Sequence, residues 1–448
     1  MSVNFISAAI VIFASSGLAA LFLRQGSPWI GRIQTFLILS GVILGFTGAF
    51  AGFMVPDTAL YLFPWPSVGG SLIGVDALSS FFLFPVFIIG LLGSVYGLGY
   101  WPEHTHAKTA GKLRFFWGLI ISGMTLLVIS KHALSFLLGW ETMAIAAFFL
   151  ISTEDEKADC RKSALIYLIA THLGTLMIFA FFTLWRSTTG TFELDPLLAG
   201  LISPKTGNIL FLLVLTGFGL KAGIMPLHFW LPGAHANAPS HVSALLSGVM
   251  LKMGIYGIVR MLTLLQGISP FWGWLILLLG ASSGLLGVIF ALAQHDLKKL
   301  LAYHSVENIG IILLGLGMAL LGRSYLRQEW VVLGMAGCLL HVWNHSLFKS
   351  LLFFGAGSVL HRTGTREIDR LGGLSKGMPL TAFTFLIGAA AISGLPPLNG
   401  FISEFFIYLG FFRSAGSTVK LLSLSLLAVP VLAMIGALAV SCFVIVYG

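Results

Sequence analysis

Long apolar segments dominate this sequence, and they constrain the fold more than any other feature. A helix needs about 20 consecutive apolar residues to cross a bilayer, and the chain contains thirteen segments of this kind. They predict an all-α polytopic membrane protein with about 13–14 transmembrane helices. The thirteen segments are 3–23, 33–53, 77–100, 113–130, 132–152, 163–185, 207–230, 241–263, 270–293, 301–321, 330–358, 380–410 and 419–447.

The composition excludes several other classes of protein. Charged residues make up 9% of the chain, whereas a soluble domain carries about 25%. The connections are too short to form a soluble domain, so a nucleotide or flavin site has no room to fold. The formal net charge is +9, but the basic residues stand singly between apolar segments, which is typical of membrane loops rather than of nucleic-acid binding. The three cysteines are scattered, so neither a disulfide framework nor a cysteine-based metal site is expected.

The basic residues of the connections indicate the orientation of the chain. Cytoplasmic connections of membrane proteins carry an excess of lysine and arginine. With the N-terminus outside, 14 basic residues fall in inner connections and 8 in outer ones, so we expect this orientation. Of the 25 basic residues, only Lys221, Lys252 and Lys349 then remain, and all three lie inside predicted spans.

Two of the predicted spans contain a glycine followed closely by proline. One contains the run from Gly223 to His228, and the other the run from Gly394 to Asn399. Because proline removes a helical hydrogen bond, both helices, the seventh and the twelfth, are expected to break within the membrane. Broken helices at matching places in two halves of a chain are typical of transporters built from repeats.

This pattern predicts a division of the chain into three parts. Residues 1–110 would form helices 1–3, residues 111–264 a first five-helix repeat, and residues 265–448 a second repeat that is incomplete at its C-terminus. Because five is an odd number of spans, the two repeats are expected to be inverted relative to each other.

Charged side chains inside the spans are the main candidates for function. A charge at the bilayer centre costs about 2.5–3.5 kcal/mol, yet Glu141, Lys221, Lys252, Lys349 and Glu404 all lie within predicted spans. Burial lowers the pKa of a lysine and a nearby carboxylate raises it, so a lysine can be switched between loaded and empty states. Arginine stays protonated, and no arginine is expected deep in a span. The pattern favours proton transfer, with snorkelling and static ion pairs as the alternatives.

Histidines add to this set. His341, His345 and Lys349 follow one another at intervals of four residues, so they share one face of a helix. Imidazole titrates near neutral pH, which is suitable for a proton path; hydrogen bonding between helices is the alternative, and a His-x3-His metal pair is disfavoured. The further candidates are His172 and His228, and with less support Glu307, which could instead lie at a helix end, His235 and His241.

The long motif from Gly219 to Ser240 resembles the signature of the antiporter-like, proton-translocating subunits of respiratory complex I. The run Leu251–Gly257 and the pair Trp140-Glu141 are similar to the same family. The runs Ala302–Gly310 and Asn344–Phe353 resemble its membrane-bound hydrogenase branch, of the formate hydrogenlyase type. The resemblance covers roughly residues 70–448.

The resemblance implies about fourteen helices with two inverted five-helix repeats. It also implies that Glu141 modulates Lys221, that Lys252 passes the proton inward along a central polar axis, and that Glu404 is the acceptor on the exit side. The histidine and lysine face of span eleven would lie on this axis. Many complex I relatives carry lysine in span twelve, where this chain has Glu404, and His172 stands where some relatives have a carboxylate.

The same resemblance implies a non-redox subunit of a [NiFe]-hydrogenase or formate hydrogenlyase complex in a prokaryotic inner membrane. The chain itself would bind no cofactor, and the [NiFe] and iron–sulfur centres would lie in partner subunits. The expected partners are other membrane subunits and a peripheral redox arm. Two alternatives stay open: a cation/proton antiporter subunit without a redox partner, and a proton-coupled component for uptake of inorganic carbon.

Overall fold

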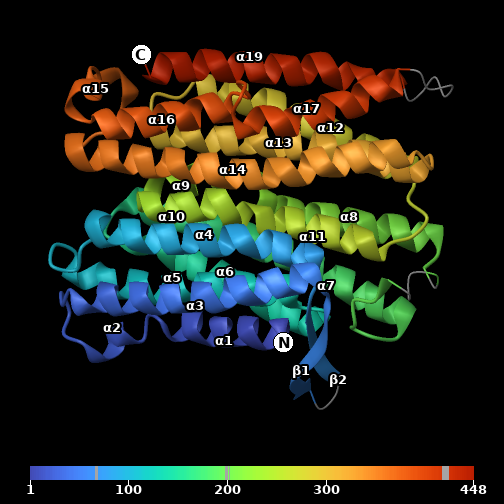
Figure 1. The fold of residues 1–448 in the computed structure, drawn as a ribbon, viewed down its shortest axis with the longest axis horizontal. Helices are drawn as coiled ribbons and strands as arrows, with labels where there is room; N and C mark the ends of the chain where they lie inside the picture. Colours follow the sequence, from blue (N-terminus) through green and yellow to red (C-terminus); the bar gives the residue numbers. More distant parts are fainter. Residues whose placement is uncertain (66–68, 197–199, 201, 416–422, 448) are drawn as a thin grey trace. The chain divides into compact units, whose positions relative to one another are not determined.

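The computed structural model describes residues 1–65, 69–196, 200, 202–415 and 423–447, and most of these residues are α-helical (Figure 1). Eleven of the described helices are long and apolar enough to cross a membrane. The expectation of an all-α polytopic membrane protein is therefore confirmed. Of the two other expected spans, 380–410 is divided between two shorter helices, and 207–230 contains a helix that ends at Ala222 and is followed by turns.

The described chain forms two compact units. Unit 1 consists of Met1–Lys221 and Asn237–Gln266, and unit 2 of Ala222–Ala236 and Gly267–Gly448. The elements of unit 1 are α1 (Ser2–Ser15), α2 (Ala19–Phe22), α3 (Trp29–Met54), β1 (Asp57–Trp65), β2 (Gly69–Val75), α4 (Ala77–Tyr100), α5 (Ala107–Ile129), α6 (Ala133–Ile151), a 3-10 turn (Ser152–Glu154), α7 (Ala158–Thr189), α8 (Pro204–Ala222), α10 (Ser240–Leu245), a π-helical turn (Leu246–Met250) and α11 (Leu251–Leu264). The elements of unit 2 are α9 (Leu231–Asn237), α12 (Pro270–Leu292), α13 (Leu297–Ser324), α14 (Gln328–Thr363), a 3-10 turn (Ile368–Arg370), α15 (Leu374–Gly377), α16 (Pro379–Ile392), α17 (Asn399–Ser414), a 3-10 turn (Leu424–Leu427) and α19 (Ala428–Tyr447). The inverted relation between residues 111–264 and 265–448 stays a prediction.

Both predicted helix breaks are confirmed. Helix α8 ends at Ala222, and Gly223 then adopts a φ of +76°. Helix α16 ends at Ile392, and Gly394 adopts a φ of +65°. Side chains rarely adopt this left-handed conformation, so glycine is the residue that ends each helix without strain.

Two details add to the expected arrangement of spans. A short helix, α9, follows the first break. A two-stranded antiparallel hairpin, with Asp57 opposite Val75, precedes α4, whereas no strand was expected there. A side-chain hydrogen bond joins this hairpin to α1: Asp57 accepts from Ser2 Oγ (2.6 Å).

Two arginines that were counted with the connections, Arg114 and Arg260, are largely buried inside spanning helices. Arg114 of α5 is fully buried, and its Nε donates to Glu103 Oε1 (3.1 Å) while its Nη2 donates to the carbonyl of Gly97 (2.9 Å). Arg260 lies in α11, and it pairs with Asp76. Each arginine is accommodated because a carboxylate lies beside it at the end of a helix, so their burial does not contradict the cost of an unpaired charge.

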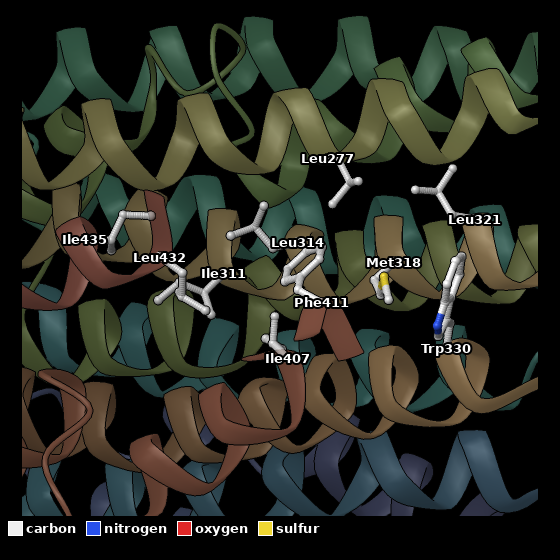
Figure 2. Close-up of a cluster of buried hydrophobic side chains, with 10 residues drawn as sticks. All are labelled: Leu277, Ile311, Leu314, Met318, Leu321, Trp330, Ile407, Phe411, Leu432 and Ile435. Carbon is white, nitrogen blue, oxygen red and sulfur yellow. The ribbon is translucent and has the colours of Figure 1, made fainter. Parts of the chain in front are cut away.

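The apolar core of unit 2 borders directly on charged residues. Ile311 of α13 lies one turn after Glu307, and Ile407 of α17 lies one turn after Glu404. The cluster therefore begins about one turn after each of the two glutamates along its helix. Its ten members, shown in Figure 2, are Leu277, Ile311, Leu314, Met318, Leu321, Trp330, Ile407, Phe411, Leu432 and Ile435.

Asp76 joins three parts of unit 1 at the N-terminus of α4. Its side chain accepts the backbone N–H of Ser79 (2.8 Å), both terminal nitrogens of Arg260 (2.8 and 2.7 Å), and Lys131 Nζ (2.5 Å). Burial alone would raise the pKa of Asp76, but the hydrogen bonds and charges of Arg260 and Lys131 outweigh it and hold the pKa far below its usual value. The carboxylate is thus a structural anchor that stays ionised.

Asp76→Asn is expected to lower the free energy of unfolding by about 2 kcal/mol at pH 7, because hydrogen bonds to a charged group are lost. Since the folded-state pKa is depressed, this contribution is present above the unfolded pKa of about 3.9 and is lost as the pH falls through the folded pKa. Thermal unfolding in detergent should therefore show a constant difference between pH 5 and 8 that narrows only in strong acid.

The matched control is Asp155→Asn, because Asp155 forms an exposed pair with Lys112 (3.4 Å). Exposed ion pairs contribute about 0–1 kcal/mol, so this variant should unfold close to the temperature of the unmodified protein. Equal stability of the Asp76 and Asp155 variants would contradict the anchoring role of Asp76.

Candidate functional site

Lys221 lies in unit 1 near the C-terminal end of α8, and it is held by neutral groups. Its side chain is almost fully buried, and Nζ donates to the hydroxyl of Tyr167 (2.8 Å) and to Thr171 Oγ1 (2.9 Å). Helices α7 and α8 approach closely at two glycines: a Cβ on Gly174 would lie 2.8 Å from the carbonyl oxygen of Gly217. This close approach brings the lysine against the hydroxyls of α7.

Glu141 of α6 is linked to Lys221 through α7. Thr175 Oγ1 shares its one hydrogen between Glu141 Oε1 (2.5 Å) and the main-chain carbonyl of Thr171 (3.1 Å). The side-chain hydroxyl of the same Thr171 accepts from Lys221. The charge of Glu141 acts on Lys221 across this bridge. The predicted coupling of Glu141 to Lys221 thus has a physical connection, made of two threonines rather than of a direct salt bridge.

The hydroxyl side chains of α7 were missed in the sequence. Tyr167, Thr171 and Thr175 are spaced by four residues and therefore share one helix face. That spacing was a usable signal, but neutral hydroxyls attract less attention than charges in a membrane span.

The opposite side of Glu141 is open to the surface of the chain. Its side chain is 29% exposed, and Oε2 lies 3.6 Å from Nε2 of His172, whose side chain is 49% exposed. His172 Nδ1 contacts the carbonyl of Leu168 (2.9 Å). The pair Glu141–His172 therefore connects the buried lysine with the outer face of α6 and α7.

Lys252 lies in unit 1 just after the π-helical turn Leu246–Met250. It is 1% exposed, and Nζ donates to the carbonyl of Ser247 (2.5 Å), five residues earlier. A π-helical turn shifts the backbone hydrogen bonds and often marks a functional position. The lysine head is thus satisfied by the backbone of its own helix.

Unit 2 contains a second buried site, centred on Glu307 of α13. His304 Nδ1 pairs with Glu307 Oε2 one turn away, and His304 Nε2 contacts Cys442 Sγ of α19 at 3.3 Å. Glu307 lies well inside its helix and is 1% exposed, so of the two alternatives left open for it, the helix-end position is excluded. A close approach to α12 holds this part of α13, since a Cβ on Gly287 would lie 2.6 Å from the Glu307 nitrogen.

Lys349 and Glu404 belong to the same site. Both side chains are buried, and the charge of Glu307 acts on each of them. Among the residues that the structure describes, neither Lys349 Nζ nor Glu307 Oε1 has a hydrogen-bond partner. The carboxylate of Glu404 packs against the second helix break, because a Cβ on Gly394 would lie 2.8 Å from Glu404 Oε2.

The two histidines of α14 lie next to each other, as their shared helix face predicts. The rings of His341 and His345 are 6.5 Å apart and nearly parallel. His341 Nδ1 contacts Ser403 Oγ (2.9 Å) and Nε2 contacts Asn308 Oδ1 (3.0 Å). Asn308 in turn donates to the carbonyl of His304 (2.8 Å), so hydrogen bonds connect His341 with the Glu307 site.

The three histidines near the first break have aromatic neighbours. His235 in unit 2 is buried with its ring 5.5 Å from that of Phe353, and the ring of His228 is 6.2 Å from that of Tyr303. His241 is buried in unit 1, with its ring 5.3 Å from Trp117. The contacts described here do not bring these histidines to the charged groups above.

The arrangement in each unit suits reversible protonation. Burial penalises the charged form of a lysine and a nearby carboxylate favours it, so the protonation of Lys221 depends on Glu141 and that of Lys349 on Glu307. Within the described ranges, no group of three or more His, Cys, Asp or Glu side chains could hold a metal ion. The buried pairs of lysine and carboxylate are suited to proton transfer.

Comparison with known proteins agrees with this class of membrane protein. Residues 130–429 match the family described as NADH:quinone oxidoreductase/Mrp antiporter, transmembrane. Two curated relatives, both from Escherichia coli K12, are hydrogenase-4 component B (38% identity over 98% of this chain) and formate hydrogenlyase subunit 3 (39% over 99%). The structure of the Mrp complex from Dietzia sp. DQ12-45-1b covers 98% of this chain at 26% identity, with a TM-score of 0.82.

These findings define the chain first as an antiporter-like, complex I-related membrane subunit with many spanning helices. More specifically, it belongs to the NADH:quinone oxidoreductase/Mrp antiporter transmembrane family. The chain spans about two thirds of the length of the two curated relatives, 66% and 70% respectively, and 46% of the matched chain in the Mrp complex.

Gly394→Ala is expected to destabilise the protein by about 1–3 kcal/mol, because a side chain at this φ is strained and its Cβ would meet the carboxylate of Glu404. Thermal unfolding of the purified protein measures the loss. The control is Gly436→Ala in α19, where a Cβ would meet nothing within 4 Å; an alanine in a helix should keep or raise stability. A Gly394→Ala variant as stable as this control would contradict the described break.

Proposed function

We propose that this chain carries protons across a prokaryotic inner membrane, with its N-terminus outside, as a subunit of a multi-subunit complex. The complex would be of the membrane-bound [NiFe]-hydrogenase or formate hydrogenlyase type, and electron transfer in partner subunits would drive the protons. The names of the two curated relatives, which are 38% and 39% identical over nearly the whole chain, support this type of complex.

One observation carries the proposal: a buried lysine is held by hydroxyls and is linked to a carboxylate that reaches the surface. Lys221 donates to Tyr167 and Thr171, and Thr175 connects this position to Glu141. A salt bridge would fix the proton on the lysine, whereas two hydroxyls can accept from a charged amine and donate to a neutral one. Movement of a charge near Glu141 would then change the proton occupancy of Lys221.

The site in unit 2 supports the same function with a different set of groups. Glu307, Lys349 and Glu404 are buried, and the charge of Glu307 acts on both of the others. His304 pairs directly with Glu307 and can exchange a proton with it, while His341 is held beside this site through Asn308. The order of the steps along one axis, from Glu141 through Lys221 and Lys252 to Glu404, remains what the family resemblance implies.

The partners follow from the same proposal. The relatives named above are subunits of multi-subunit membrane complexes, so other membrane subunits are expected beside this chain. The exposed pair of Glu141 and His172 is suited to face such a subunit, because a carboxylate at this depth is costly against lipid. The redox centres, [NiFe] and iron–sulfur, would belong to a peripheral arm.

Lys221→Met and Glu141→Gln should each reduce turnover-driven acidification of inverted vesicles to the background level. Each replacement keeps the approximate side-chain size but removes the group that gains or loses a proton, and removal of such a group typically costs at least roughly a hundredfold. The measurement compares the vesicle pH change with the rate of electron transfer in the same sample.

Two exposed residues provide matched controls: Lys205→Met on the same helix as Lys221, and Glu156→Gln before α7. Both should pump like the unmodified complex. Normal pumping by the Lys221 and Glu141 variants, at normal levels of assembled complex, would overturn the proposed path.

A cation/proton antiporter subunit is the second candidate, because the family also contains Mrp antiporters and the Mrp complex has the same fold over 98% of this chain. Such a protein would exchange Na⁺ or K⁺ for H⁺ without electron transfer. The buried sites here contain lysine and histidine, whereas a sodium site favours carboxylate and carbonyl oxygens.

Purification distinguishes the two candidates. When the affinity-tagged chain is isolated from its native membrane, the hydrogenase-type proposal predicts that nickel and iron–sulfur absorbance co-purify with it. Co-purification of other antiporter subunits alone, with Na⁺-dependent proton uptake in vesicles, would favour the antiporter.

A further inference from the structure

A line of polar side chains runs along α11 from Lys252 toward the hairpin end of unit 1. Lys252, Tyr256 and Arg260 are spaced by four residues, so they share one helix face. Lys252 and Tyr256 are fully buried, the side chain of Arg260 is 11% exposed, and beyond it Asp76 and Lys131 are 31% and 20% exposed. The contacts of Tyr256 reach Val128, Arg260 and Phe82, whereas Lys252 Nζ bonds to the carbonyl of Ser247, on the side away from Tyr256. A proton that crossed from Lys252 to Tyr256 would find polar groups from there to the surface, which would be a route for proton loss.

The hydrogen bonds of this line do not allow a proton to pass Arg260. The hydroxyl of Tyr256 donates to the carbonyl of Val128 (2.6 Å) and accepts from Arg260 Nε (3.1 Å). The terminal nitrogens of Arg260 donate to Asp76, and Nη2 also donates to Ser79 Oγ (3.1 Å). A guanidinium has only donors and stays protonated, so it can neither accept a proton from Tyr256 nor pass one to Asp76.

The net charge beside Arg260 also opposes the passage of a proton. Arg260 and Lys131 contribute two positive charges beside the single negative charge of Asp76, so this end of the line carries one net positive charge. A fixed positive charge in a narrow polar passage repels protons, as arginine does in other membrane channels. The distance along the helix from Lys252 to Arg260 is about 12 Å for eight residues, close enough for this charge to act on a proton at Lys252.

We propose that Arg260, held by Asp76, is a proton barrier that closes the polar line of α11, so that a proton on Lys252 cannot leak to the hairpin end of unit 1. The inference rests on the proposed proton-carrying function and adds a residue whose task is to prevent transfer. A purely structural role for the ion pair would stabilise the fold but would leave proton permeability unchanged.

The test measures passive proton conductance of the purified complex in proteoliposomes, with no electron donor present. A potassium diffusion potential drives protons inward, and a trapped pH dye reports their entry. Arg260→Gln should raise the conductance roughly tenfold, since a unit charge about 12 Å away is lost and the amide can both accept and donate. Arg413→Gln, which removes an exposed partner of Glu329, should leave it unchanged.

A double variant tests whether the leak follows the proposed line. Tyr256→Phe in the Arg260→Gln background removes the hydroxyl next to the barrier and should return the conductance to the unmodified level. The carbonyl of Val128 keeps Ser79 Oγ as a donor (2.9 Å), so this change does not leave it unpaired. If Arg260→Gln does not assemble, Arg260→His, whose ring can still bond to Asp76 and relay protons, is measured in the same way with and without Tyr256→Phe.

Two results would overturn the inference: an assembled Arg260 variant as tight as the unmodified complex, or a leak that persists after Tyr256→Phe. The test is separate from that of the proposed function, because turnover is absent. If the unmodified complex pumps normally and the Arg260 variant is tight, only the barrier is refuted. If the Arg260 variant leaks and the unmodified complex does not pump, only the proposed function is refuted.

Discussion

An ionisable side chain buried in a membrane protein has to be hydrogen-bonded without being fixed in one protonation state, and most features of this structure follow from that constraint. Lys221 meets it through the hydroxyls of Tyr167 and Thr171. Those contacts require α7 and α8 to approach within the space that Gly174 and Gly217 leave. They also require α8 to end beside the lysine, which the left-handed conformation of Gly223 permits.

The two units meet the constraint in different ways. In unit 1 the carboxylate of Glu141 is separated from the lysine by a hydroxyl bridge and faces the surface. In unit 2 Glu307 lies among buried groups and is paired with His304, while an apolar cluster begins one turn away. The first arrangement suits control by a neighbouring subunit, and the second suits transfer among groups inside the chain. The arginines Arg114 and Arg260 are instead held in static pairs by Glu103 and Asp76.

The sequence predicted those features that a segment encodes by itself. Apolar length gave the spans, the Gly-to-Pro runs gave both breaks, and four-residue spacing placed His341 beside His345. The sequence did not predict contacts between distant segments. His304 and Cys442 are 138 residues apart, and no nearby motif of either residue indicates the other. The burial of Arg260 was missed for a similar reason, because its partner lies 184 residues away. The threonines of α7 had a helical spacing that could have been used, but neutral side chains give a weak signal.

The central claim is that this chain moves protons in addition to those consumed or released by the redox reaction of its complex. The most direct measurement is the ratio of protons translocated to electrons transferred, obtained with the unmodified complex in sealed vesicles and a fast pH indicator. We expect a ratio above the value set by the chemical reaction alone. A protonophore should abolish this excess, and removal of sodium should leave it unchanged. A ratio equal to the chemical value, in vesicles shown to be tight, would contradict it.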